Sequence, residues 1–309
     1  MSLLWACGPG GASAPALAPD APASGAAPAP IGAAAPARKG ADDARGGRLF
    51  DNWRAEKKLT QSFVPDSAKT PELDGQGGPN ANGTLNSGSG TALPNTGHDY
   101  RLKNLFGWDL RGAKGIYGPG FQNKSQVLPH DLLTDARSPE DLRAWLTQGD
   151  ERVPALGQVL DAADMDDLVA YLVKTRQGEL ARPDRLFRLE AAAPKSYVLL
   201  PGGDATRGRA QYEESCAMCH GKDGRELPID ETESLGTMSR SSGYEVWFKM
   251  VNGQPGTDMQ RQVSGASGAE QERAILDLFA ALCDRQSFPP LAGASDVPQG
   301  DVRCGAYLR

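Results

Sequence analysis

Apolar residues recur at helical spacing in several separate stretches of the chain. The pattern predicts helices over 46–53, 164–173, 208–212, 244–251 and 269–283. In the last of these, one face carries Ala274, Ile275, Leu278, Phe279 and Leu282. In the helix before it, one face carries Val246, Trp247, Met250 and Val251. These segments predict a mainly α fold.

Two stretches lack this periodicity. Residues 8–43 are dominated by Ala, Pro and Gly, and such a composition cannot bury enough apolar surface to offset chain entropy. We therefore expect a disordered tether there. Residues 62–96 are rich in Gly, Asn, Pro, Thr and Ser, which predicts a long loop. This loop is either an insertion that wraps a partner or a solvated, variable segment.

Length and charge narrow the class of protein. The chain has 309 residues, with 33 basic and 39 acidic side chains and a formal net charge of −6. A nucleic-acid-binding protein is not indicated, because no surplus of basic residues is present to neutralise phosphates. The sequence contains no apolar run of about 18 residues or more, so it predicts no transmembrane helix.

The five cysteines are placed as one, two and two along the chain. The first, Cys7, closes Leu-Trp-Ala-Cys, which resembles a bacterial lipobox. This resemblance implies that Cys7 carries lipid, and stable anchoring needs more than one acyl chain. Only six residues precede Cys7, fewer than the charged and apolar regions of a secretory signal contain. Either the start of the sequence is truncated or misassigned, or Cys7 is an incidental free thiol.

Residues 216–220 read Cys-Ala-Met-Cys-His, the strongest chemical signal in the chain. Cys216 and Cys219 share one face of a helical turn, so both thiols can add to the vinyl groups of a haem. His220 follows directly and can serve as proximal iron ligand. Zinc would need a second cysteine or histidine pair, and a redox dithiol would need a βαβ context. With its flanking G-x-x-x-Y and G-x-D-G sequences, the motif resembles the opening of a class I cytochrome c domain, which implies one covalent haem c.

This resemblance also implies a methionine as sixth iron ligand, and three methionines are candidates. Met259 ends Asn-Gly-Gln-Pro-Gly-Thr-Asp-Met, which resembles the N-G-x-P-G-x-x-M ligand loop of periplasmic cytochromes. Met250 lies on the apolar face of its helix and is expected in the core. Met238 is expected in a Ser/Thr-rich loop and remains an alternative. We take His220 and Met259 as the expected iron ligands.

Cys283 and Cys304 lie near the end of the chain. In an exported protein this pair is expected to form a disulfide that closes the tail onto the last helix. A loop of about 20 residues predicts roughly 3 kcal/mol of stabilisation in the chain-entropy treatment. Two buried free thiols are the alternative.

The first half of the chain carries a second resemblance. Residues 46–53 read Gly-Gly-Arg-Leu-Phe-Asp-Asn-Trp, and residues 100–109 read Tyr-Arg-Leu-Lys-Asn-Leu-Phe-Gly-Trp-Asp. Both resemble bacterial tandem dihaem cytochromes, which open G-G-R-L-Y-D-N-W and carry W-R-C-K-E-C-H-G-W-D. Leu102 and Leu105 then take the two cysteine positions and Phe106 takes that of the histidine. The resemblance implies a cytochrome c-like first domain without haem, in which these apolar residues fill part of the haem space.

No other histidine of the first half is expected to replace the missing ligand. His98 lies just before the degenerate window and His130 lies in a loop, and both are expected at the surface. The expected distal loop, residues 149–154, contains no Met or His. The first domain is therefore expected to be a structural or docking module.

The resulting architecture is mainly α, with two tandem cytochrome c-like domains, long loops and a disordered tether in front. Its expected parts are a lipobox remnant at 1–7, the tether at 8–43, a haemless domain at 44–182, an interdomain linker at 183–200 and a domain with one covalent haem at 201–309.

The expected protein is a periplasmic, lipoprotein-anchored monohaem cytochrome that carries single electrons between redox protein partners. The alternative is a fixed subunit of a larger membrane-associated respiratory or photosynthetic complex. A dihaem dehydrogenase is not expected, because a single haem with both axial positions filled offers no open site for substrate.

Overall fold

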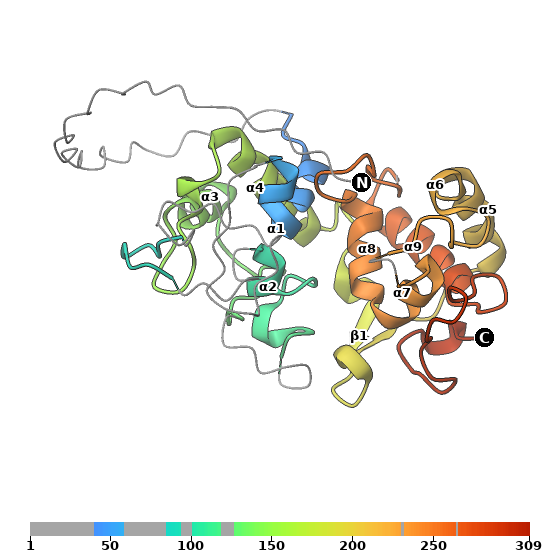
Figure 1. The fold of residues 1–309 in the computed structure, drawn as a ribbon. Helices are drawn as coiled ribbons and strands as arrows, with labels where there is room; N and C mark the ends of the chain where they lie inside the picture. The colour runs from blue at the N-terminus through green and yellow to red at the C-terminus, as the bar shows by residue number, and fades with distance from the viewer. Residues whose placement is uncertain (1–39, 59–84, 94–100, 119–126, 230–231, 264) are drawn as a thin grey trace, which may run out of the picture. The chain divides into compact units, whose positions relative to one another are not determined.

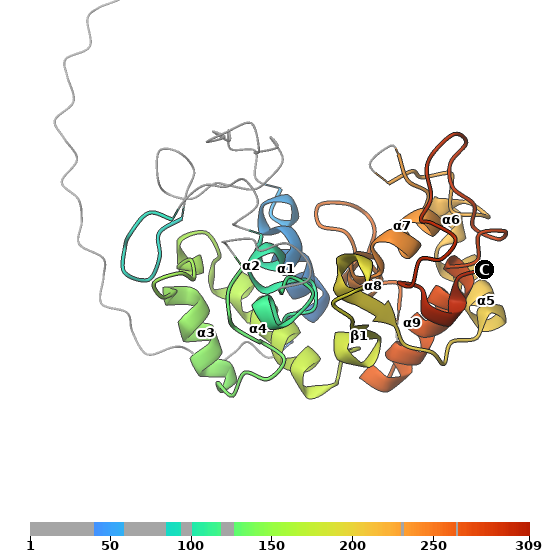
Figure 2. The same ribbon diagram turned by 90° about the horizontal axis from the view of Figure 1, so that it is seen from below.

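The computed structural model describes residues 40–58, 85–93, 101–118, 127–229, 232–263 and 265–309 (Figures 1 and 2). All of these residues belong to one compact unit. Cys7, His98, the tether up to residue 39 and most of the loop at 62–96 lie outside the described residues.

The described residues form mainly helices. The α-helices are α1 (Asp43–Glu56), α2 (Leu102–Phe106), α3 (Pro139–Gln148), α4 (Ala162–Gln177), α5 (Ala205–Ser215), α6 (Ala217–His220), α7 (Leu235–Ser241), α8 (Gly243–Asn252) and α9 (Gly268–Leu282). Short 3₁₀ helices span Gly112–Lys114, Leu156–Gln158, Pro183–Arg185, Pro194–Ser196 and Gly305–Tyr307. The two strands are β1 (Phe187–Leu189) and β2 (Tyr197–Leu199). The five helices predicted from periodicity are confirmed as α1, α4, α5, α8 and α9, and the fold fits the expected mainly α class.

Helix α1 packs against α4 through a glycine and two charged contacts. A Cβ atom on Gly46 would lie 1.9 Å from the Asp167 carbonyl oxygen, so only glycine permits this approach. The Arg45 Nη1 atom lies 2.8 Å from Asp167 Oδ2. The Asp42 backbone N–H donates to Asp167 Oδ1 at 2.8 Å. The two helices are thereby fixed backbone to backbone.

Helix α5 packs against α9 through the same set of contacts. A Cβ atom on Gly208 would lie 1.8 Å from the Asp277 carbonyl oxygen. The Arg207 Nε atom lies 2.7 Å from Asp277 Oδ2, and the Asp204 N–H donates to Asp277 Oδ1 at 2.6 Å. Both helix pairs thus begin with the sequence D-x-x-R-G, at 42–46 and 204–208.

The intervening helices of the two halves also end alike. Helices α2 and α6 are followed by Gly107 and Gly221, with φ of 75° and 77° and ψ of 157° and 175°. Helices α3 and α8 are followed by Gly149 and Gly253, with φ of 69° and 89° and ψ of −174° and −176°. These positive φ values favour glycine. The order α1–α2–α3–α4 therefore parallels the order α5–α6–α8–α9.

The three apolar residues that were expected to replace haem-binding residues in the first half lie in the core. Leu102, Leu105 and Phe106 on α2 are 0%, 4% and 0% exposed. Phe106 contacts Trp145 edge to face, with ring centroids 6.0 Å apart. His130 was expected at the surface but is partly buried, with its ring centroid 5.0 Å from that of Trp145. Burial lowers the pKa of His130.

The segment at 183–200, expected as an interdomain linker, contains an ordered hairpin. Strands β1 and β2 pair antiparallel, with Phe187 opposite Leu199. The Phe187 ring stacks on Tyr244 of α8 at a centroid distance of 4.1 Å. The Tyr197 hydroxyl accepts a hydrogen bond from the Gly243 N–H at 2.6 Å. This hairpin is therefore part of the hydrophobic core beside α8.

The C-terminal tail is tied to the helices covalently and by a buried cation. Cys283 and Cys304 form a disulfide, which confirms the expected pairing. Arg240 of α7 is fully buried and pairs with Asp296 of the tail at 2.8 Å. Its Nη1 atom also donates to the Phe288 carbonyl at 3.0 Å. In the described part of the chain, no helix combines the length and apolar character needed to cross a membrane.

Candidate functional site

Helix α5 delivers the Cys-x-x-Cys-His motif and fixes the turn after it. The Tyr212 hydroxyl, buried in the core, donates to the Gly221 carbonyl at 2.6 Å. Gly221 takes a φ of 77°, which ends α6 directly after His220. The tyrosine of the G-x-x-x-Y sequence therefore has a structural role, because Tyr212 of α5 binds the backbone directly after the motif.

The two thiols of the motif are free and lie one helical turn apart. Cys216 is partly buried and Cys219 is exposed. The His220 N–H donates to the Cys216 carbonyl at 2.9 Å, so both ends of the motif belong to one turn. Burial, together with the charge of Cys219, raises the pKa of the Cys216 thiol to about 11. Met218, which lies between the two cysteines, is 91% exposed and is therefore not part of the hydrophobic core.

His220 places a neutral imidazole at the end of this turn. Its Nδ1 atom is buried and makes no hydrogen bond to any described residue. Burial lowers the pKa of His220, and the Leu227 backbone opposes this shift. The side chain is therefore neutral at neutral pH, which is the form that ligates metals.

This donor set fits a covalently attached haem better than a zinc ion. Two free thiols and a neutral imidazole on a single turn are what attachment through thioether bonds and proximal ligation require. In the described ranges, no group of three or more His, Cys, Asp or Glu residues is arranged to hold a metal ion. A structural zinc site needs four protein ligands of these kinds.

Met259 lies on the loop between α8 and α9, apart from the motif in the sequence. The side chain is partly buried. The Met259 carbonyl accepts from the Gln254 N–H at 2.9 Å, and its N–H donates to Thr257 Oγ1 at 3.2 Å. The backbone of the loop is thus held by hydrogen bonds on both sides of the Met259 side chain.

The other two methionines lie elsewhere. Met250 on α8 is 5% exposed and belongs to the core, as its helical position predicts. Met238 was expected in a loop but lies in α7, where it is 7% exposed. This helix forms because the Ser234 side chain caps it by accepting from the Thr237 N–H. Both methionines are therefore held by packing on helices.

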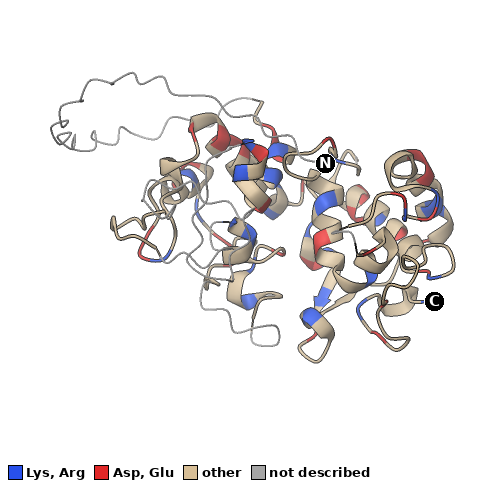
Figure 3. Cartoon of the chain, in the orientation of Figure 1, with Lys and Arg blue, Asp and Glu red and all other residues tan. Residues whose placement is uncertain are grey.

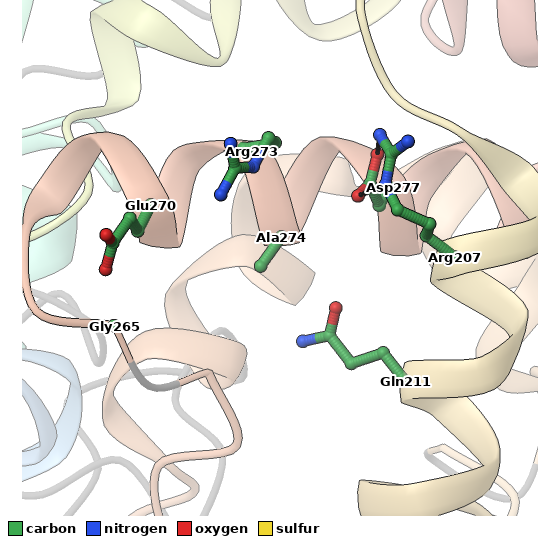
Figure 4. A pocket seen from close by; sticks show the side chains of 7 residues that line it. All are labelled: Arg207, Gln211, Gly265, Glu270, Arg273, Ala274 and Asp277. Carbon is green, nitrogen blue, oxygen red and sulfur yellow. Dashed lines mark hydrogen bonds and ion pairs between the residues drawn. The ribbon is translucent and has the colours of Figure 1, made fainter.

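A surface pocket of about 600 Å³ lies between α5 and α9, away from the motif (Figure 4). It is lined by Arg207, Gln211, Gly265, Glu270, Arg273, Ala274 and Asp277. The Arg207–Asp277 pair that joins the two helices lies at one end of it. None of the motif residues lines this pocket.

Residues 203–277 match the family described as Cytochrome C oxidase, cbb3-type, subunit III. No curated protein and no solved structure matches the chain. The matched range includes α5, α6, α7, α8, the Met259 loop and most of α9. The match and the arrangement on α6 together support a c-type cytochrome domain in this segment, and with it haem c and electron transfer.

Proposed function

We propose that this protein is a monohaem electron-transfer cytochrome. Cys216 and Cys219 would hold haem c through two thioether bonds, and His220 and Met259 would ligate its iron. The observation that carries the proposal is the turn α6, where two free thiols directly precede the partly buried, neutral imidazole of His220. The match of residues 203–277 to a cytochrome family supports it.

The chain's own residues set the conditions of electron transfer. The haem iron, when bound, supplies a one-electron redox change. Tyr212 holds the turn that presents His220, through its bond to the Gly221 carbonyl. A thioether from Met259 favours reduced iron, so His/Met ligation gives a higher potential than two histidines. The role is that of an electron carrier rather than an enzyme.

The first half is proposed to be a cytochrome c-like domain that carries no haem. The helix order α1–α2–α3–α4, the D-x-x-R-G contacts and the glycine caps parallel those of the second half. In place of the two thiols and the imidazole, α2 carries Leu102, Leu105 and Phe106, all of them buried. With no thioether bond and no proximal ligand from α2, this half serves as structural or docking module.

The proposed location is the periplasm, with an anchor at Cys7. The Cys283–Cys304 disulfide supports an oxidising compartment, and haem attachment through cysteines is expected in the same place. Anchoring at Cys7 rests on the lipobox-like sequence alone. Redox proteins are the proposed partners.

A second candidate function is that of a fixed subunit in a membrane-associated redox complex. The observation in its favour is the matched family itself, whose description is that of an oxidase subunit. Purification from the membrane fraction separates the two: a free monomer supports the shuttle, and a stable complex with other chains supports the subunit.

The ligand assignment is tested by two matched methionine variants of the purified haem protein. Met259→Ala is expected to abolish the near-infrared charge-transfer band of His/Met-ligated haem and to lower the reduction potential. Met238→Leu, at the other candidate, is expected to leave both unchanged. If Met238→Leu removes the band and Met259→Ala keeps it, the assignment of Met259 is wrong.

A further inference from the structure

Helix α1 of the first half runs beside the loop that carries Met259 and binds its first residue. Arg48 is 7% exposed, and its Nη1 atom donates to the Asn252 carbonyl at 2.9 Å. Asn252 itself is fully buried. A Cβ atom on Gly47 would lie 2.1 Å from the Asn252 side chain, so this glycine lets α1 approach the loop.

The far end of the loop is bound to the same helix. Arg261, two residues after Met259, forms an ion pair with Asp43 in the first turn of α1. Its Nε atom donates to the Val251 carbonyl at 2.6 Å, which closes the base of the loop onto the end of α8. Asp43 also pairs with Lys174 of α4 at 2.7 Å. Arg261 therefore links the ligand loop to the α1–α4 pair.

The tip of the loop touches the last turn of α1. Gly256 has a φ of 72°, and a Cβ atom there would lie 2.7 Å from the Ala55 carbonyl oxygen. Its N–H donates to Glu56 Oε2 at 3.4 Å. The loop thus meets α1 near both ends and in the middle of the helix, through Asp43, Arg48 and Ala55–Glu56. Figure 3 shows acidic and basic residues along α1 and on α8.

A further charged contact holds the helix in front of the loop. Lys249 of α8 pairs with Asp51 of α1, which is fully buried. Burial raises the pKa of Asp51, but Lys103, Lys249 and Arg101 overcome this and hold the pKa below its usual range. The carboxylate is therefore charged at neutral pH, and α8 is fixed to α1 directly before the loop begins.

We propose that α1 positions the Met259 loop, so that the haemless half controls how firmly the sixth ligand of the neighbouring haem is held. The inference rests on the proposed function, in which Met259 ligates iron. Asp43, Arg48 and Arg261 are positioning residues, because their contacts hold the loop and the helix beside it. A loop held in its ligating conformation loses less conformational entropy when the ligand binds, so breaking these contacts favours ligand loss.

The test uses the purified haem protein and the near-infrared band of methionine ligation, followed as temperature rises. Arg261→Gln and Asp43→Asn each remove the ion pair that ties the loop to α1. We expect the band to disappear at lower temperature and the fraction of protein without methionine ligation to rise roughly fivefold. Arg261→Lys keeps the positive charge. We expect this variant to lose the band at a temperature between those of Arg261→Gln and the natural protein.

Lys174→Gln is the matched control, because it removes the other partner of Asp43 and leaves the Arg261 contact. It is expected to behave like the natural protein. If Arg261→Gln and Asp43→Asn also match the natural protein while Met259→Ala lacks the band, the inference is overturned and the proposed ligation stands. If the natural protein itself lacks the band although haem is bound, Met259 is not the ligand, and both are overturned.

Discussion

Asp109 is a buried carboxyl group whose charge the fold does not fully compensate. It is 1% exposed, and its Oδ2 atom accepts from the Ile116 N–H at 3.0 Å. The Oδ1 atom has no partner among the described residues. Burial raises the pKa of Asp109 from 3.8 to about 7, against weaker effects of the Ile116 N–H and of Arg111. Folding therefore favours the protonated, neutral form of Asp109 over its carboxylate.

This pKa predicts a pH dependence with a definite sign. Between about pH 4 and pH 7 the folded state binds a proton that the unfolded state has lost. The stability that this proton supplies is complete below about pH 4 and is lost as pH rises through about 7. Asp109→Asn is neutral throughout, so its stability relative to the natural protein is expected to rise by roughly 4 kcal/mol between pH 4 and pH 8.

Urea unfolding at a series of pH values measures this difference. Glu140→Gln, at an exposed carboxyl of α3, is the control for removal of a surface charge. A flat difference for Asp109→Asn would show that Asp109 does not retain its proton in the folded state.

Single residues differ in how well sequence predicts them. Cys216, Cys219 and His220 lie three and one positions apart, so a local motif is enough to place them on one turn. The contact of Arg261 with Asp43 joins residues 218 positions apart, and no local pattern marks it. Positioning residues of this kind follow from tertiary packing, which the pattern of apolar residues does not resolve.

Two glycines fix the helix pairs of the two halves. Gly46 and Gly208 each face a backbone carbonyl oxygen that a Cβ atom would approach within 2 Å, at 1.9 Å and 1.8 Å. Because that oxygen belongs to backbone, relief requires a whole helix to move. Gly46→Ala and Gly208→Ala are each expected to lower the free energy of unfolding by roughly 1–3 kcal/mol.

Chemical denaturation of the two variants measures this cost, with Gly300→Ala as control. Gly300 has no atom within 4 Å of an added Cβ and is expected to tolerate alanine. If Gly46→Ala is as stable as Gly300→Ala, the close crossing of α1 and α4 is not what holds the first half together.

Helices with long apolar stripes were predictable, and shorter elements were not. Helices α8 and α9 follow their periodicity to within one residue at each end. The hairpin at 187–199 has strands of three residues each. Such strands are too short to show an alternation of apolar and polar residues in the sequence. Helix α7 depends on the Ser234 cap within a Ser/Thr-rich stretch, whose composition resembles a loop.

At the scale of the whole molecule, the two halves share a core. Phe50 of α1 stacks on Phe248 of α8 with ring centroids 5.9 Å apart. Tyr171 of α4 contacts the same Phe248 ring edge to face at 5.7 Å. With the buried Asp51–Lys249 pair, these contacts make the first half part of the structural support of the second.

The similarity of the two halves was predictable only in part. The motif at 216–220 and the segment at 102–106 that was aligned with it pointed to two similar halves. The D-x-x-R-G repeat at 42–46 and 204–208 was a further signal in the sequence. Its meaning emerges only when Asp167 and Asp277 are seen to receive the same contacts.

The central claim is that one of two similar halves holds haem. Its most direct measurement is the number of haems per chain, from a pyridine haemochrome assay with the chain concentration fixed by amino-acid analysis. One haem per chain is predicted for the natural protein, and none for a Cys216→Ala, Cys219→Ala variant. Two haems per chain in the natural protein, or retention of covalent haem in that variant, would contradict the account.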